Sequence, residues 1–249
     1  MAATSETIEL IVENEQIAGT LLAPRRQMPG ILFVHGWGGS QTRDMMRAKG
    51  IAGLGCVCLT FDLRGHEKTL LQKQTVTRGH NLEDILVAYD RLVEHPSTDP
   101  GRIAVIGTSY GGYLAAILTT LRPVRWLATR VPALYWDEQW NLPKQQLDRQ
   151  QLMKYRQSVL GPLDNRALGA CATFEGDVLI VESEHDEHVP HDTIMNYRSS
   201  FRKAHSMTHR IIDGADHGLS SERCQQAYTT ILTNWISEMI IGDRIGHLS

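Results

Sequence analysis

The feature that most constrains this chain is the segment VIGTSYGGYL at residues 105–114, where one serine stands between closely spaced glycines. An apolar strand-like run leads into it and a helix-like run leaves it. A tight turn between strand and helix strains the central residue and lifts its side chain clear of the sheet. Gly107 and Gly111 lack side chains that would collide as the two elements approach each other. We therefore expect the Ser109 hydroxyl at the carboxyl edge of a sheet, where open α/β folds bind ligands.

The chemistry expected at this turn is nucleophilic attack on a carbonyl group. A helix starting at Tyr110 would direct free N–H groups and its positive dipole end at the Ser109 hydroxyl. Two simpler interpretations compete. Ser109 could be a helix N-cap beside packing glycines, and a bare G-x-S-x-G pattern arises by chance about 0.1 times in a chain of this length. The deciding question is whether catalytic partners follow in the chain.

The rest of the chain alternates strand-like and helix-like segments, which predicts an α/β fold with a mostly parallel sheet and helices on both faces. After an antiparallel hairpin at about 7–24, the expected strands cover residues 30–36, 56–65, 102–107, 124–131, 177–184 and 208–214. The expected helices cover residues 42–55, 80–95, 110–121 and 224–240. Residues 132–170, rich in Gln, Trp and Pro, break this alternation. We interpret them as a small cap within one domain over 1–249, the alternative being a crossover helix with long loops.

Two candidate partners for the serine follow later strands. A serine hydroxyl is a weak nucleophile until a base removes its proton and a carboxylate orients that base. Asp186 follows the strand-like run VLIVESE, and His217 follows the next strand-like run in IIDGADHGL. Both would lie on loops at the same edge of the sheet as Ser109. Their competitors are Glu182, Glu184 and Glu187 for the carboxylate and His209 for the base.

The combined motifs resemble the α/β-hydrolase fold. They are HGWGG at 35–39, FDLRGHE at 61–67, GTSYGG at 107–112, HDEHVP at 185–190 and GADHGL at 214–219. The resemblance implies the chain order Ser, Asp, His, an aspartate followed by x-x-V-P, and a histidine in G-x-x-H. It therefore favours Ser109, Asp186 and His217 as the catalytic triad. It also implies an oxyanion hole formed by the backbone N–H groups of Trp37 and Tyr110.

Within that superfamily, the opening hairpin, the HGWGG loop and the length resemble the small serine esterases related to dienelactone hydrolase. Dienelactone hydrolases proper use a cysteine nucleophile, so Ser109 favours ordinary carboxylic esters, cleaved through an acyl-enzyme. Thioesterase, amidase or peptidase and acyltransferase activities remain open, as does a non-catalytic binding protein. A peptidase of the prolyl oligopeptidase type usually carries an extra N-terminal domain, which the resemblance does not include here.

Several side chains near the expected site have two interpretations. Tyr135, Trp136 and Trp140 begin the cap segment and would form an apolar pocket for an acyl or aryl group, or would pack cap against core. Arg130 could bind an anionic substrate group, although a structural ion pair is favoured. His35, Asp62 and His66 are expected to shape loops by hydrogen bonding.

Composition sets limits on partners. The formal net charge of −3 gives no general attraction to nucleic acid or to anionic membranes. We expect a small-molecule ester as substrate, no cofactor and no metal, since Pro190 interrupts the cluster His185, His188 and His191. The acidic start does not resemble a secretory signal. The four cysteines are expected to be buried free thiols, which favours a cytoplasmic location. The sequence does not predict the natural substrate or the oligomeric state.

Overall fold

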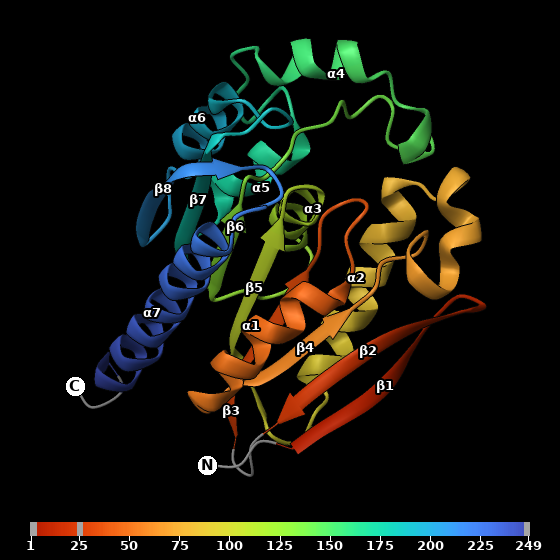
Figure 1. Ribbon diagram of the computed structural model, residues 1–249. Coiled ribbons are helices and arrows are strands. Elements are labelled where there is room, and N and C mark those ends of the chain that lie inside the picture. The colour runs from red at the N-terminus through yellow and green to blue at the C-terminus, as the bar shows by residue number, and fades with distance from the viewer. Residues whose placement is uncertain (1–3, 24–26, 247–249) are drawn as a thin grey trace.

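An eight-stranded sheet forms the centre of the computed structural model, which describes residues 4–23 and 27–246 (Figure 1). Its strand order is β1-β2-β4-β3-β5-β6-β7-β8. The antiparallel hairpin β1–β2 joins the sheet antiparallel to β4, and all strands from β3 to β8 pair in parallel. The strands are β1 (Thr4–Val12), β2 (Glu15–Ala23), β3 (Met28–Val34), β4 (Val57–Phe61), β5 (Thr98–Thr108), β6 (Trp126–Arg130), β7 (Asp177–His185) and β8 (Ser206–Asp216).

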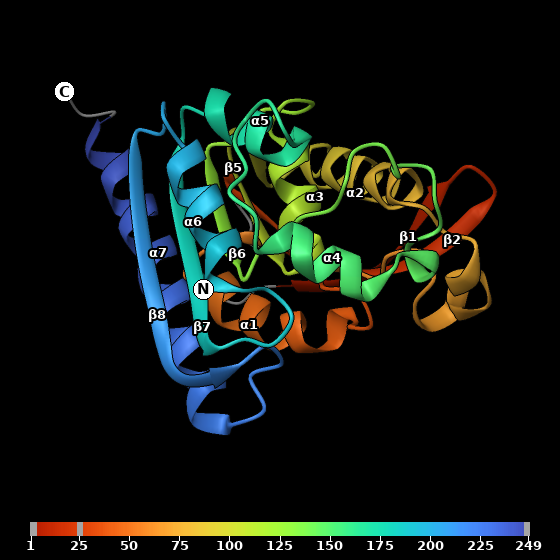
Figure 2. The ribbon, with the colours of Figure 1, turned by 90° about the horizontal axis from the view of Figure 1, so that it is seen from above.

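Helices cover both faces of this sheet (Figure 2). One face carries α1 (Gln41–Gly53) and α7 (Glu222–Gly246). The other face carries α2 (Arg78–Val93), α3 (Tyr110–Leu118), α5 (Arg166–Thr173) and α6 (His191–Ser200). The mostly parallel α/β sheet predicted from the sequence is thereby confirmed. In the described part of the chain, no helix combines the length and the apolar character needed to cross a membrane.

Each face of the sheet has its own hydrophobic core. Helix α2 buries Ile85, Ala88, Tyr89 and Leu92, the i, i+3, i+4, i+7 pattern of an amphipathic helix with one stripe against the sheet. Helix α3 differs because all nine of its residues are buried. It is therefore the central helix of its layer, and its N-terminus lies directly behind the turn that carries Ser109.

Two helices of the α2 layer do not appear among the sequence predictions, α5 and α6. Helix α6 begins at His191 immediately after Pro190, whose extended backbone makes it the N-cap residue. The sequence analysis treated Pro190 as a helix breaker, but proline is well tolerated at a helix start because its missing N–H has no partner there. The short 3-10 helix η1 (Glu67–Gln74) was also not predicted.

The segment 132–170 leaves the sheet layer and then returns to it. The 3-10 helix η2 (Lys144–Gln146) and helix α4 (Arg149–Arg156) lie above the carboxyl ends of the strands (Figures 1 and 2). Arg156 ties α4 down, donating to the carbonyl oxygens of Leu134 at 3.2 Å and His188 at 2.7 Å. Helix α5, at the end of the segment, buries its apolar side in the α2 layer core.

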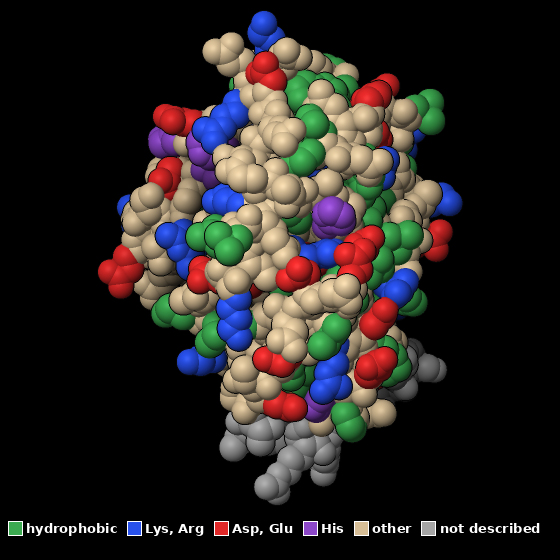
Figure 3. Space-filling view, turned by 90° about the vertical axis from the view of Figure 1, so that its right-hand side faces the viewer, with side chains coloured by type: hydrophobic (Ala, Val, Ile, Leu, Met, Phe, Trp, Pro, Cys, Tyr) green, Lys and Arg blue, Asp and Glu red, His purple; other side chains and the backbone are tan. Residues whose placement is uncertain are grey.

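The surface beside the β1–β2 hairpin mixes acidic and basic side chains, with hydrophobic ones scattered among them (Figure 3). No field of a single charge dominates this face. Inside the molecule, the four cysteines Cys56, Cys58, Cys171 and Cys224 are buried, as the sequence analysis expected.

Candidate active site

Ser109 occupies a strained turn between β5 and α3. Its φ of 53° and ψ of −111° lie where non-glycine residues are rarely found, and such strain persists only when the surroundings hold it. Here the Ser109 N–H donates to the carbonyl oxygen of Arg130 at 2.8 Å. The Ser109 carbonyl oxygen accepts the N–H groups of Ala133 and Tyr113, each at 3.1 Å. The end of β6 and the first turn of α3 therefore fix the backbone of this serine.

The glycines around the serine permit very close backbone packing. A Cβ atom on Gly111 would lie 2.2 Å from the carbonyl oxygen of Val34, and one on Gly107 would lie 2.6 Å from that of Gly111. Neither position leaves room for any side chain. Strand β5 and helix α3 can therefore approach each other closely, as the sequence motif implied, and the turn also packs directly against the end of β3.

Asp186 and His217 come together at the ends of β7 and β8. His217 Nδ1 lies 2.7 Å from Asp186 Oδ2, and the aspartate side chain is almost entirely buried. Asp186 Oδ1 accepts the N–H groups of His188 at 2.8 Å and Val189 at 2.7 Å. Burial by itself would raise the pKa of Asp186, but the hydrogen bond and charge of His217, with these N–H groups, hold that pKa below its usual value.

This arrangement fixes the state of the imidazole. A carboxylate accepts hydrogen bonds, so His217 carries its proton on Nδ1 and leaves the Nε2 lone pair available. Ser109 and His217 line the same two cavities. Within the described ranges the Ser109 hydroxyl makes no side-chain hydrogen bond of its own. Catalytic hydrogen bonds are often long in free enzymes and shorten when substrate binds.

Two histidines shape the loop at residues 35–39. His35 Nε2 accepts the N–H of Leu63 at 3.0 Å, and His66 Nε2 accepts the N–H of Gly38 at 2.9 Å. Burial, with the charge of His35, lowers the pKa of His66 to about 4, so its ring is neutral and able to accept near neutral pH. Both histidines therefore have the loop-shaping role that the sequence analysis expected for them.

The backbone N–H groups of Trp37 and Tyr110 remain available beside the serine. Tyr110 is the first residue of α3, where an N–H has no partner within the helix. In the described ranges, neither of these two N–H groups donates to a turn, loop or cap acceptor. Two free donors beside a serine hydroxyl are suited to stabilising the oxyanion that forms during acyl transfer.

Two cavities meet at Ser109. The first, of about 340 Å³, lies between the 35–39 loop and α1 and is lined by Arg43, Arg47 and Arg130 together with Asp44 and Glu67. We call it the arginine cavity. The second, of about 280 Å³, lies beneath α4. We call it the cap cavity, and it is lined by Trp37, Ser109, Tyr135, Lys144, Gln145, Leu147, Arg149, Leu152, Met153, Arg156, His188 and His217.

The three aromatic residues expected in a substrate pocket have different positions. Tyr135 lines the cap cavity and packs edge-on against Tyr110, with ring centroids 5.6 Å apart. Trp136 and Trp140 line neither of the two cavities. Trp140 instead lies between two arginines, with the Arg166 guanidinium 4.0 Å from its ring centroid. Both tryptophans pack against the hydrophobic core of the α2 layer, and packing was the alternative interpretation of the aromatic cluster.

The sequence analysis did not single out the cations of the cap cavity. Lys144, Arg149 and Arg156 lie within residues 132–170, which the sequence analysis described only as rich in Gln, Trp and Pro. Their convergence depends on how η2 and α4 fold back over the sheet. The pattern PKQQLDRQQLMKYR contains several basic residues and one acidic residue, and this imbalance is a signal that could have identified them.

The histidine cluster near Asp186 does not converge. His191 Nδ1 lies 2.6 Å from Glu182 Oε1, whereas the His188 ring packs against His217 with centroids 4.8 Å apart. Glu182 also contacts His209 at 3.0 Å, so the two competitors named for the triad bind each other. Among the described residues, no group of His, Cys, Asp and Glu side chains is arranged to hold a metal ion.

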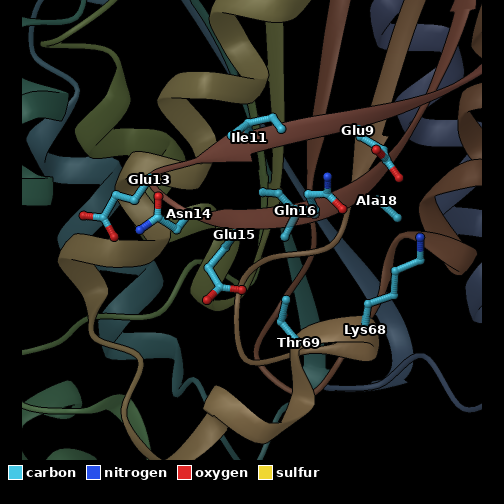
Figure 4. Close-up of a pocket in the computed structure, with 10 residues that line it drawn as sticks. Glu9, Ile11, Glu13, Asn14, Glu15, Gln16, Ala18, Lys68 and Thr69 are labelled. Carbon is cyan, nitrogen blue, oxygen red and sulfur yellow. The ribbon is translucent and has the colours of Figure 1, made fainter.

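A third cavity, of about 550 Å³, lies elsewhere, between the β1–β2 hairpin and η1 (Figure 4). Its lining includes Glu9, Glu13, Glu15 and Lys68. It contains none of the residues around Ser109, and its lining side chains come from the β1–β2 hairpin and η1 (Figure 4). We therefore place the candidate site at Ser109 rather than in this cavity.

Comparison with family models gave one match. A model of the prolyl oligopeptidase family matches residues 43–242, which include Ser109, Asp186 and His217. No match was found among curated proteins.

Solved structures share the fold at low sequence identity. A dienelactone hydrolase from Anabaena variabilis is 18% identical with a TM-score of 0.69, covering 95% of this chain and 98% of its own. Pyrococcus horikoshii acylaminoacyl peptidase is 17% identical with a TM-score of 0.69, covering 94% of this chain but 41% of its own. Porphyromonas gingivalis dipeptidyl peptidase 4 is 15% identical with a TM-score of 0.67, covering 95% and 35% respectively. The α/β-hydrolase fold predicted from the motifs is confirmed.

Proposed function

This chain is a serine hydrolase of the prolyl oligopeptidase family, and on that premise we propose that it cleaves carboxylic esters through Ser109, His217 and Asp186. The observation that carries the proposal is the 2.7 Å contact between His217 Nδ1 and Asp186 Oδ2 at the cavities that also contain Ser109. Within the described residues, His217 Nε2 has no hydrogen-bond partner, and it lines the same cavities as a Ser109 hydroxyl that forms no side-chain hydrogen bond. That pairing is what activates a serine nucleophile.

The proposed reaction has two halves. His217 Nε2 takes the proton of Ser109 as its Oγ attacks the ester carbonyl carbon, and the N–H groups of Trp37 and Tyr110 stabilise the oxyanion. The tetrahedral intermediate then expels the alcohol, which receives the proton from His217, and an acyl-enzyme remains. Water attacks this ester with His217 again as base, which releases the acid and regenerates Ser109. Asp186 holds the imidazole in place throughout.

Residues 132–170 are proposed to be a cap that selects substrates. The support is that η2 and α4 from this segment form one wall of the cap cavity directly above Ser109. Side chains of this segment, rather than those of the sheet, would then determine which acyl or alcohol groups reach the serine.

The first experiment replaces Ser109 and follows 4-nitrophenyl acetate turnover. The Ser109→Ala variant should fold normally and lose activity by about 10⁶-fold, as expected when a nucleophile of a triad is removed. Ser158→Ala, which changes an exposed cap serine, is the matched control and should keep full activity. A fluorophosphonate probe should label the wild-type protein on Ser109, as read by mass spectrometry. A protein that forms no adduct would instead be a non-catalytic binding protein of this fold.

Amide or peptide hydrolysis is the second candidate, and the match to the prolyl oligopeptidase family favours it. The same triad can cleave esters, thioesters and amides. The discriminating measurement is kcat/KM for three compounds with the same acetyl group: phenyl acetate, S-phenyl thioacetate and acetanilide. A peptidase would also cleave short peptides at rates comparable with its ester turnover, whereas the proposed esterase would leave them intact.

A further inference from the structure

The cap cavity has an unbalanced charge. Three cationic side chains line it, Lys144, Arg149 and Arg156, and no aspartate or glutamate is among its lining residues, all of which the structure describes. The arginine cavity on the other side of Ser109 differs, since Asp44 and Glu67 line it beside the arginines. Of the two cavities at Ser109, the one beneath α4 is therefore the one lined by positive charge without an acidic side chain.

Lys144 is the cation held most closely in this cavity. Its Nζ lies 4.8 Å from the ring centroid of Trp37, 5.3 Å from that of Tyr135 and 5.7 Å from that of Tyr110. Aromatic rings attract a cation through their electron-rich faces. They also hold the ammonium beside the residue after the serine and the loop that supplies the second oxyanion donor. Burial lowers the pKa of Lys144, and Tyr135 partly opposes this effect.

The other two cations are bound differently. Arg156 is already satisfied, because its guanidinium donates to the carbonyl oxygens of Leu134 and His188 and lies 4.9 Å from the Tyr135 ring centroid. Arg149 begins α4 at the rim of the cavity, is exposed, and forms no ion pair within the described residues. Lys144 and Arg149 are therefore the two cations left with capacity for a ligand.

A partly buried cation without a carboxylate partner is costly, because desolvation is not repaid by an opposite charge. A substrate that carries its own carboxylate would supply that charge at the moment of binding. A substrate with a free ammonium group would be repelled by the same side chains. The cavity is small, about 280 Å³, so the anion would be carried on a short chain.

We infer that the cap cavity binds a carboxylate group of the substrate through Lys144 Nζ and Arg149, so that the enzyme prefers esters of short anionic molecules. This inference rests on the proposed hydrolytic function of Ser109 and adds the substrate class. The carboxylate belongs either to the acyl chain or to the alcohol, depending on which part enters the cap cavity. In both cases the reacting carbonyl lies at Ser109 and the anion lies at Lys144.

The test measures binding separately from catalysis. In the Ser109→Ala variant, which cannot form an acyl-enzyme, calorimetry gives the Kd of two matched pairs. The acyl-side pair is monophenyl adipate and phenyl methyl adipate. The alcohol-side pair is 4-carboxyphenyl hexanoate and its carboxyl methyl ester. We expect at least one pair to show about tenfold or tighter binding of the carboxylate form, the range of a hydrogen bond to a charged group.

Variants of the cap then identify the group responsible. Lys144→Met should reduce the ratio of Kd for the neutral ester to Kd for the carboxylate to about one. Lys144→Arg should keep most of this preference, because a guanidinium also binds carboxylates. Arg149→Gln should reduce it in part. Lys154→Met removes an exposed lysine of the same helix that does not line the cavity, and it should change nothing.

Several outcomes would overturn the inference. Equal binding of both members in both pairs means that the cavity does not recognise a carboxylate. If Lys144→Met loses the same binding affinity for the charged and the neutral member of a pair, Lys144 only anchors η2 over Trp37. Neither result contradicts the proposed function. That function is contradicted if the wild-type protein neither hydrolyses these esters nor reacts with the fluorophosphonate.

Discussion

Arg130 donates from Nη2 to the carbonyl oxygen of His217 at 2.9 Å, and its own carbonyl oxygen accepts the N–H of Ser109 at 2.8 Å. One residue of β6 therefore contacts both the proposed nucleophile and the loop of the proposed base. The sequence analysis favoured an ion pair for this arginine, but the contacts formed are to a backbone oxygen and to Ser183 Oγ at 3.4 Å. Arg130 acts as a positioning residue between two neighbouring strand ends.

Removing this link should lower kcat more than it changes KM. In Arg130→Met the His217 loop loses its tether, and a displacement of about 1 Å can cost about 10²-fold in rate. Arg130→Lys keeps a donor on a shorter side chain and should restore part of the rate. The measurements are kcat and KM for 4-nitrophenyl acetate, with a thermal melt to confirm folding. A Met variant with unchanged kcat would contradict this role.

Asp186→Asn should abolish most activity while preserving the fold. The asparagine oxygen can still accept the N–H groups of His188 and Val189, but its NH₂ group would face His217 Nδ1 and favour the wrong tautomer. In a serine triad this change costs about 10⁴-fold in kcat. Asp192→Asn, at an exposed aspartate of α6, is the control and should retain wild-type rates. Activity in Asp186→Asn equal to that of the control would exclude Asp186 from the triad.

Two glycines in different surroundings, Gly111 beside the Ser109 turn and Gly50 on α1, give stability predictions of opposite sign. Gly111→Ala would place a Cβ 2.2 Å from one backbone oxygen and 2.6 Å from another, those of Val34 and His35. Backbone cannot move aside like a flexible side chain, so we expect a loss of at least about 4 kcal/mol in the free energy of unfolding. Gly50→Ala, in open space on α1, should instead stabilise by about 0.5–1 kcal/mol. Urea denaturation measures both.

The sequence predicted those parts of the fold that depend on local pattern. Apolar runs at 30–36 and 102–107 identified the central strands β3 and β5, and the glycines around Ser109 identified the turn between β5 and α3. Helix α6 was missed because Pro190 predicts a helix break unless it is known to be the N-cap residue. Helix α5 was missed because its eight residues are too few to show a clear helical periodicity of apolar side chains.

In the candidate site, too, the features that depend on local sequence pattern were predicted and the others were not. Ser109, Asp186 and His217 follow strands, so strand prediction alone brought them to one edge of the sheet. The cap cavity depends instead on how η2 and α4 fold back, which no local pattern encodes. Trp136 and Trp140 illustrate the limit, because aromatic clustering predicted a pocket whereas these tryptophans line neither cavity at Ser109 and pack against the core. The motifs, hairpin and length indicated a branch related to dienelactone hydrolase, and the family match adds the prolyl oligopeptidase family.

His66 should make the protein less stable in mild acid. Its pKa is about 4 in the folded state and near 6.5 when unfolded, so the unfolded state binds the proton more readily. The contribution of His66 to the free energy of unfolding is complete above pH 6.5. It is lost as the pH falls from 6.5 through about 4, and the total loss is about 3 kcal/mol. His66→Gln, which keeps an acceptor for Gly38 but does not titrate, should show a shallower fall of unfolding free energy between pH 7 and 4. Parallel curves for the two proteins would contradict this assignment.

The pH dependence of substrate preference tests the charge of Lys144 directly. Burial lowers the pKa of this ammonium below its usual 10.5, despite the opposing effect of Tyr135. The Tyr110 and Trp37 rings and the Arg149 and Arg156 cations also face it. The carboxylate preference requires the protonated amine, so it should be greatest below the lowered pKa and disappear as the pH rises through it.

The measurement is the ratio of kcat/KM for monophenyl adipate to that for phenyl methyl adipate, taken from pH 6 to pH 10. A ratio removes any titration of His217, because both substrates use the same base. In Lys144→Arg the guanidinium remains charged over the whole range, so the ratio should become independent of pH. A wild-type ratio that stays constant up to pH 10, or that falls equally in the arginine variant, would assign the preference to another group.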